Sequence, residues 1–213
     1  MRKKILFTLC AILVLNIFPL LLKPALILNF KTFILLISAA VLWLSQPGFS
    51  KQDMNSDKQS DKLSILLILI ASSISVFSSV IEWAYFTPDK SQINSVTVIG
   101  FIFLLIGICF RVWSINVLGK NFTATVKITR EHELIKTGPY KLIRHPSYLG
   151  AFVAIIGCPV FLNNTYTIFI SCIAMIIAYY FRINLEEKTL SNHFGKYYED
   201  YKKDTYRLLP LIW

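Results

Sequence analysis

The sequence predicts an all-α, polytopic integral membrane protein with about six transmembrane helices. Hydrophobic residues make up 55% of the chain and charged residues only 16%, whereas ordinary soluble domains contain about 25% charged residues. The apolar residues fall in long blocks, several of them near the ~17–25 residues that span a bilayer. Lysine and arginine gather between these blocks, as they do at membrane boundaries.

The apolar blocks predict each helix in turn. Asn163 and Asn164 suit a tight turn inside the last block, which is therefore expected to form two short helices. Lys31 interrupts the second block, so that helix is expected to begin nearer residue 30, with the lysine reaching toward the membrane surface. The predicted crossing segments are 5–22, 26–45, 63–86, 95–117, and a pair within 147–183.

The first apolar block is predicted to be a retained membrane helix. Its apolar stretch is longer than the ~7–15 residues of a signal-peptide core, and no A-x-A-like cleavage site follows it. The larger polar segments are 46–62, 118–145 and 184–213. We expect residues 1–117 to form the first four transmembrane helices with their loops, and residues 118–213 to form the functional core.

The distribution of cations predicts the orientation in the membrane. Arg2, Lys3 and Lys4 place the N-terminus in the cytoplasm, because lysine and arginine are enriched on that side. Six crossings then place the 46–62 loop, the 118–145 segment and the C-terminus in the cytoplasm as well. A bacterial inner membrane and the endoplasmic reticulum are both compatible with this pattern.

The net charge of +10 and the four cysteines point to no nucleic-acid or metal site. The cations lie between apolar blocks, so membrane topology and anionic headgroups explain them better than a nucleic acid does. The cysteines form no CxxC motif and have no histidine at zinc-binding spacing. We expect Cys10, Cys109, Cys158 and Cys172 to be reduced, hydrophobic side chains.

The stretch "GPYKLIRHPSYLG" at residues 138–150 is the first candidate site. A helix is predicted to begin near Pro146, because proline at the first helical position lacks an N–H that would be unsatisfied there. The N-terminus of that helix would attract an anion, and Arg144 and His145 would reinforce it. The alternative is a plain interfacial anchor, since basic residues and tyrosines are common at membrane boundaries.

The stretch "FRINLEEKTLSNHFGKYYEDY" is the second candidate site. Arg182 and Glu186 are four residues apart and share one helix face, with Glu187 beside them. Such a pair is usually a surface salt bridge of small energetic weight. Arg182 lies at the edge of an apolar run, however, where a charge is costly unless it is paired or functional. We expect His145 and Arg182 to lie close together at the cytoplasmic boundary.

In order along the chain, "LGKNFT", "HELIKTGPYKLIRHPSYLG", "FRINLEE" and "HFGKYYEDYKK" resemble the isoprenylcysteine carboxyl methyltransferase family. The resemblance covers roughly residues 118–213. It implies an integral membrane enzyme that uses S-adenosylmethionine to methylate the carboxylate of a prenylated cysteine. It also implies catalytic roles for Arg182 and Glu186, with Arg182 at the substrate. The cofactor-binding residues that it implies are Lys127, His132, Glu133, Leu134, Ile135, Tyr140, His145, Pro146, Ser147, Tyr148 and Glu186.

The chemistry of a carboxylate acceptor fits these residues. A carboxylate is already a nucleophile near neutral pH, so the site needs no general base. Arg182 would hold the acceptor carboxylate through two parallel hydrogen bonds that lysine cannot reproduce. The expected partners are a lipid-modified or other hydrophobic carboxylate and the membrane lipids.

Three other function classes remain open from the sequence. A phospholipid N-methyltransferase would need a deprotonated amine and would depend less on Arg182. An NADPH-dependent membrane reductase of the sterol type carries a similar RHPxYxG stretch, usually with asparagine and an acidic residue where this chain has Ser147 and Ala151. A scaffold or transporter would leave the clustered motifs unexplained.

Overall fold

The computed structural model describes residues 2–46, 59–123 and 133–209. Within those ranges the protein is helical, and its one extended pairing is a parallel bridge between Ile143 and Tyr206. The main helices are α1 (Arg2–Ile12), α2 (Phe30–Ser45), α4 (Gln59–Ile81), α5 (Ser95–Leu118), α6 (Pro146–Phe161), α7 (Tyr166–Phe194) and α8 (Lys196–Lys203). The all-α fold that the sequence predicts is therefore confirmed for the described residues.

Among the described residues, three helical stretches are long and apolar enough to cross a membrane. They are Ser60–Phe86, Ser95–Asn121 and Tyr166–Phe194. Shorter apolar helices cover Lys4–Leu20, Phe30–Ser45 and Pro146–Phe161. A helix lies in every predicted crossing segment, and six complete crossings remain a prediction.

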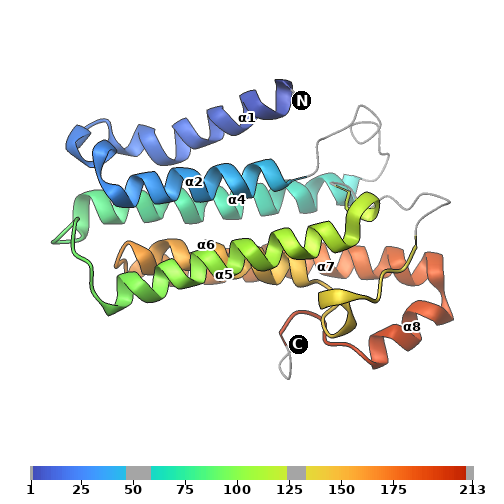
Figure 1. Ribbon diagram of the computed structural model, residues 1–213. Coiled ribbons are helices and arrows are strands. Elements are labelled where there is room, and N and C mark those ends of the chain that lie inside the picture. The colour runs from blue at the N-terminus through green and yellow to red at the C-terminus, as the bar shows by residue number, and fades with distance from the viewer. Residues whose placement is uncertain (1, 47–58, 124–132, 210–213) are drawn as a thin grey trace.

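The helices form a bundle in which α1, α2 and α4 lie on one side and α5, α6 and α7 on the other (Figure 1). Helix α4 packs on α7, α1 packs on α2, and α5 runs along α6 over most of its length. The N-terminus, the end of α5, the beginning of α6 and helix α8 all lie at one end of the bundle (Figure 1). This end therefore gathers the polar segments that the sequence places on one side of the membrane.

Four glycines allow α5 and α6 to approach each other closely. A Cβ atom added to Gly150 would lie 2.6 Å from the backbone nitrogen of Arg111, and one added to Gly157 would lie 2.6 Å from that of Leu104. Gly100 and Gly107 on α5 face α6 in the same way. Small residues let helix backbones touch in membranes, where van der Waals packing drives association. The pairing fixes the position of α6, whose first residues carry the candidate site.

The opposite end of the bundle is closed by polar contacts between helices. The carboxylate of Glu82, which follows α4 in a π-helical turn, accepts hydrogen bonds from the backbone N–H groups of Thr165, Tyr166 and Thr167 at 2.8, 3.1 and 2.7 Å. These groups begin α7 and have no partner within that helix. Asn163 adopts a φ of 59° in the turn before them, as the sequence predicts.

Two local expectations can be checked in α2 and α6. Helix α2 begins at Phe30, where the side chain of Asn29 accepts from the backbone nitrogen of Lys31 at 3.0 Å. The expectation that Lys31 reaches the membrane surface is wrong: the residue is 0% exposed, and its ammonium lies 5.9 Å from the ring centre of Phe161. Helix α6 begins at Pro146, as predicted.

Candidate active site

A pocket lies at the end of the bundle where α5 ends and α6 begins. Its walls come from the end of α5, the segment before α6, the first turn of α6, the C-terminal half of α7 and helix α8. About 800 Å³ of space that no protein atom fills lies between these walls, with the open solvent at the mouth included. The lining residues are Leu118, Asn121, Phe122, Thr123, Glu133, Leu134, Ile135, Tyr140, Arg144, His145, Ser147, Tyr148, Arg182, Glu186, Leu190, Tyr198 and Tyr201.

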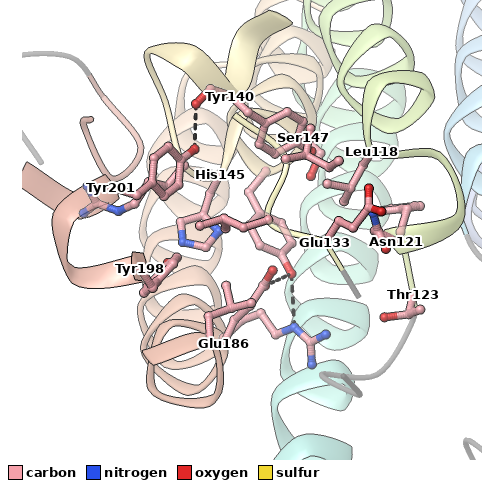
Figure 2. A pocket seen from close by; sticks show the side chains of 17 residues that line it. Leu118, Asn121, Thr123, Glu133, Tyr140, His145, Ser147, Glu186, Tyr198 and Tyr201 are labelled. Atoms are coloured by element: carbon pink, nitrogen blue, oxygen red, sulfur yellow. Dashed lines mark hydrogen bonds between the residues drawn. The ribbon is translucent and has the colours of Figure 1, made fainter. Parts of the chain in front are cut away.

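The near wall of the pocket depends on two glycines. Gly119 ends α5 with a φ of 54° and Gly138 begins a short 3-10 helix, Gly138–Lys141, with a φ of 57°. Left-handed backbone of this kind favours glycine, which has no Cβ. The turn at Gly119 places Asn121 beside the pocket, and the turn at Gly138 places Tyr140 there (Figure 2).

The first turn of α6 forms the floor. Pro146 has no N–H, and the backbone N–H groups of Tyr148 and Leu149 donate to the His145 carbonyl, both at 3.2 Å. Most of the N–H groups that would bind an anion at this helix start already donate within the helix. Fewer donors are therefore available to an anion than the sequence suggests. The side chains of His145 and Ser147 still face the pocket (Figure 2).

A hydrogen-bonded network joins α6 to α7 across the pocket. The Tyr148 hydroxyl donates to Glu186 Oε2 at 2.8 Å and accepts from Arg182 Nε at 3.1 Å. Arg182 Nη1 also donates to Asp61 Oδ1 at 2.6 Å and to Ser64 Oγ at 3.1 Å. One guanidinium therefore links the first turns of α4 and α6 to α7.

The wall of the pocket on the α8 side is aromatic and contains Tyr140, Tyr198 and Tyr201. The Tyr201 hydroxyl donates to the Tyr140 carbonyl at 2.6 Å, as Figure 2 shows. Burial raises the pKa of the Tyr201 phenol to about 12. Burial and then the nearby Glu186 carboxylate raise the pKa of Tyr140. These phenols therefore stay neutral at physiological pH and act as donors, and their rings offer flat surfaces to a ligand.

Most of the residues predicted for the site come together in this pocket. Pro146 is buried at the start of α6 and shapes the floor without lining it. Lys127 and His132 lie outside the described residues. The predicted residues that line the pocket are Glu133, Leu134, Ile135, Tyr140, His145, Ser147, Tyr148, Arg182 and Glu186.

Two arginines have partners that the sequence does not reveal. Arg182, which is predicted to hold an acceptor carboxylate, also makes a buried ion pair with Asp61. Arg144 was expected to face an anion, and its Nε donates to Glu187 at 2.8 Å. A charge buried away from water needs a partner of opposite sign, and the fold supplies one in each case from a distant part of the chain.

Sequence reasoning missed several lining residues and supports. Asn121, Phe122 and Thr123 lie in "LGKNFT", and Tyr198 and Tyr201 lie in "HFGKYYEDYKK"; both motifs carried the resemblance but were assigned no role. Arg111 was missed inside an apolar block. It is buried in α5, and its Nη1 donates to the Ser147 carbonyl at 2.8 Å. A charge within a transmembrane segment is itself a signal of function, and it could have identified Arg111.

The comparisons with known proteins define the class as membrane methyltransferases. A solved structure described as the eukaryotic intramembrane Ras methyltransferase, isoprenylcysteine carboxyl methyltransferase, superimposes with a TM-score of 0.65 and 28% identity, covering 94% of this chain and 73% of that one. The model of the isoprenylcysteine carboxyl methyltransferase family matches residues 98–192.

Curated relatives carry the corresponding enzyme name. Protein-S-isoprenylcysteine O-methyltransferase B of Arabidopsis thaliana is 32% identical over 70% of this chain and 79% of its own length. Protein-S-isoprenylcysteine O-methyltransferase of Xenopus laevis is 35% identical over 62% of this chain, which spans about half of that relative, 48% of its length. The chain belongs to the isoprenylcysteine carboxyl methyltransferase family. The predicted family and enzyme class are thereby confirmed, and neither the lipid amine methyltransferase nor the reductase is favoured.

Proposed function

We propose that this protein is an integral membrane enzyme that transfers a methyl group from S-adenosylmethionine to the carboxylate of a prenylcysteine or a similar lipid-modified acceptor. The observation that carries the proposal is the convergence of nine residues, predicted from two separate motifs, on one pocket at the end of a helical membrane bundle. The names of the relatives support the carboxyl O-methyl transfer.

The chemistry of the pocket fits the cofactor. S-adenosylmethionine, when bound, supplies an electrophilic methyl group on a positively charged sulfur. The Glu186 carboxylate lines the pocket and suits that positive charge, while the rings of Tyr140 and Tyr198 suit a flat base. The residues that would hold the cofactor are Glu133, Leu134, Ile135, Tyr140, His145, Ser147, Tyr148 and Glu186, with Lys127 and His132 added by the family resemblance.

The residues of the pocket would act by positioning. An acceptor carboxylate needs no base to become a nucleophile, so the enzyme's task is to align it with the methyl group and exclude water. Alignment alone can lower a barrier by up to ~7–11 kcal/mol. Arg182 is held on two sides by Asp61 and Tyr148, which fixes the plane of its guanidinium at the pocket wall. We assign Arg182 to the acceptor side and Glu186 to the cofactor side of the Tyr148 hydroxyl.

A two-part assay tests the proposal. The purified protein in detergent is titrated with S-adenosylmethionine and separately with NADPH, and S-adenosylmethionine alone is expected to bind. The protein is then given S-adenosylmethionine with a labelled methyl group, together with either prenylcysteine analogues or extracted lipids. Base treatment should release labelled methanol from the product, because methyl esters hydrolyse and N-methyl groups do not.

Two results would overturn the proposal. Binding of NADPH without binding of S-adenosylmethionine would favour a reductase. Base-stable label on lipids, with none on the prenylcysteine analogue, would favour an N-methyltransferase. The variant Tyr166→Phe, at an exposed tyrosine at the opposite end of α7, is the matched control and should behave as the parent chain does in both parts.

A further inference from the structure

Glu187, the neighbour of Glu186 on α7, contacts three basic side chains. Its Oε1 accepts from Arg144 Nε at 2.8 Å and lies 3.3 Å from His145 Nε2, and its Oε2 accepts from Arg207 Nη2 at 2.8 Å. Glu187 is buried, with 8% of its surface exposed. It does not line the pocket, whereas Arg144 and His145 both do. Glu187 therefore lies directly behind two residues of the pocket wall.

The third of these side chains, Arg207, belongs to the C-terminal segment Asp204–Leu208, which runs beside the residues that precede α6. The Tyr206 N–H donates to the Leu142 carbonyl at 2.9 Å, and the Tyr206 carbonyl accepts from the Arg144 N–H at 2.9 Å. The Arg207 carbonyl accepts from the His145 N–H at 3.2 Å. The segment thus contacts the backbone of the same two residues whose side chains Glu187 binds.

Side chains fasten the segment at both ends. Arg144 Nη1 donates to the carbonyls of Lys202, at 3.1 Å, and Thr205. Arg207 Nη2 donates to Asn184 Oδ1 of α7 at 2.5 Å, besides its bond to Glu187. Leu208 is buried in the hydrophobic cluster that contains Ile183. The carboxylate of Glu187 is the point where α7, the start of α6 and the C-terminal segment meet.

The charge balance explains why this contact can control the pocket wall. A free arginine side chain samples many rotamers. The ion pair with the buried Glu187 carboxylate holds Arg144 in one of them, and this costs side-chain entropy. Removing one partner of a buried ion pair leaves the other charge uncompensated. Without Glu187, Arg144 and His145 would lose their shared anion and would reorient toward the pocket or toward water.

We propose that Glu187 is a positioning residue for the methyl donor, and that the segment Asp204–Leu208 is a strap whose docking is coupled to cofactor binding through it. The inference rests on the proposed function of this pocket. The two adjacent glutamates then differ in role. Glu186 lines the pocket and accepts from Tyr148, whereas Glu187 lies outside the pocket and orients Arg144 and His145. Coupling is reciprocal, so a bound cofactor stabilises the strap by the same factor by which the strap tightens cofactor binding.

The test compares Glu187→Gln and Arg207→Gln with the control Lys203→Gln. Lys203 lies just before the strap, and its side chain is 73% exposed in a surface pair with Asp200. We expect Glu187→Gln to weaken S-adenosylmethionine binding at least tenfold and Arg207→Gln about threefold to tenfold, measured by calorimetry in detergent. The control should bind as the parent chain does. At saturating cofactor, kcat should stay within about twofold in all three, because the loss lies in binding.

Hydrogen exchange gives a readout that is independent of turnover. S-adenosylmethionine should slow exchange at the amides of Arg144, His145 and Tyr206 in the parent chain and have little effect on them in Glu187→Gln. If Glu187→Gln fails to fold, Arg207→Gln carries the test, because it removes only the partner on the strap. The double variant should lose less affinity than the two single losses multiplied, since both changes break one link.

Unchanged cofactor affinity in Glu187→Gln and Arg207→Gln would overturn the inference. A lower unfolding temperature together with unchanged affinity would also overturn it and would leave Glu187 as a structural residue only. A parent chain that binds no S-adenosylmethionine would be a different failure, because it would remove the proposed function itself and the coupling along with it.

Discussion

The Tyr148 hydroxyl is the smallest unit on which the candidate site depends. It donates to Glu186 and accepts from Arg182, so it separates a carboxylate from a guanidinium while bonding to both. Tyr148 projects from the first turn of α6, and its partners lie one turn apart on α7. A single oxygen atom therefore sets the distance between the residue that we assign to the cofactor and the residue that we assign to the acceptor.

Removing this oxygen should weaken the site without unfolding the protein. In Tyr148→Phe the ring remains, and its contact with the Tyr179 ring, at 5.1 Å between centroids, is kept. Hydrogen bonds to charged groups contribute about 1.5–3 kcal/mol, so we expect S-adenosylmethionine to bind about tenfold more weakly. Titration calorimetry measures this, with Tyr166→Phe as the control. Equal affinity in both variants would mean that the hydroxyl is not part of the cofactor site.

Arg182→Lys tests the acceptor side. Lysine keeps the charge, but its single nitrogen cannot reproduce the bonds that Nη1 and Nε make to Asp61 and Tyr148. We expect methyl transfer to slow at least ~30-fold, a loss of roughly 2 kcal/mol, with cofactor affinity within about threefold of the parent chain. Single-turnover rates with a prenylcysteine analogue give the answer. Turnover within threefold of the parent chain would leave Arg182 as a structural anchor.

At the residue scale, the sequence predicts those features of the site that depend on residues close together in the chain. Pro146 marks a helix start by its own geometry, and the spacing of Arg182 and Glu186 places both on one face of α7. The partners Asp61 and Glu187 could not be assigned in this way. Asp61 meets Arg182 from 121 residues away, and Glu187 meets Arg144 from 43 residues away.

At the scale of elements, the contact between α5 and α6 positions the site. Helix α6 carries His145 to Tyr148 at its start, and Arg111 of α5 holds the Ser147 carbonyl. The spacing of the glycines could have predicted this contact, because Gly100 and Gly107 lie seven residues apart, as do Gly150 and Gly157. Their partnership depends on the pairing of two helices, which hydrophobic blocks alone do not reveal.

Gly150→Ala should disturb both packing and binding. The new methyl group would lie 2.6 Å from the Arg111 backbone nitrogen, so α6 must shift, and overpacking of this kind costs about 1–3 kcal/mol. We expect a lower unfolding temperature in detergent and weaker binding of S-adenosylmethionine. The control Ile106→Ala changes an exposed face of α5 and should leave cofactor binding unchanged. Parent-like stability and affinity in Gly150→Ala would argue against the close contact.

Glu82→Gln should separate stability from function. Glutamine keeps one acceptor oxygen but loses the charge that faces the N-terminus of α7, which should destabilise the protein by about 1–2 kcal/mol. The start of α7 lies roughly 30 Å from Glu186, at 1.5 Å per residue, so cofactor affinity should not change. Thermal unfolding and calorimetry measure the two effects, and Asp89→Asn, in the neighbouring loop, is the control. A loss of cofactor affinity in Glu82→Gln would contradict this separation.

At the scale of the whole molecule, the helical class and the side-by-side placement of the polar segments follow from the alternation of apolar and charged blocks. The assignment of residues 1–117 and 118–213 to separate parts remains a prediction, and the interlocked α5 and α6 join the two parts across that boundary. The described residues that line the pocket all belong to the second part, but Asp61 and Arg111 of the first part bind Arg182 and the Ser147 carbonyl. The bundle is therefore the unit that creates the site.

The orientation of the bundle is the last prediction. The N-terminus, the pocket and α8 lie at one end (Figure 1), and the enrichment of cations there predicts that this end faces the cytoplasm. Lys90 lies in the short loop between α4 and α5 at the opposite end. In a chain whose four native cysteines have been replaced by serine, a cysteine at position 203 should resist an impermeant thiol reagent in intact cells, and one at position 90 should react.

Permeabilised cells provide the control for this labelling, because both positions should then react. A cytoplasmic pocket also suits a soluble methyl donor that meets an acceptor anchored in the membrane. Labelling at position 203 but not at position 90 in intact cells would reverse the orientation and would place the pocket on the wrong side for a cytoplasmic donor. Labelling at both positions would show that the chain does not cross the membrane as the bundle requires.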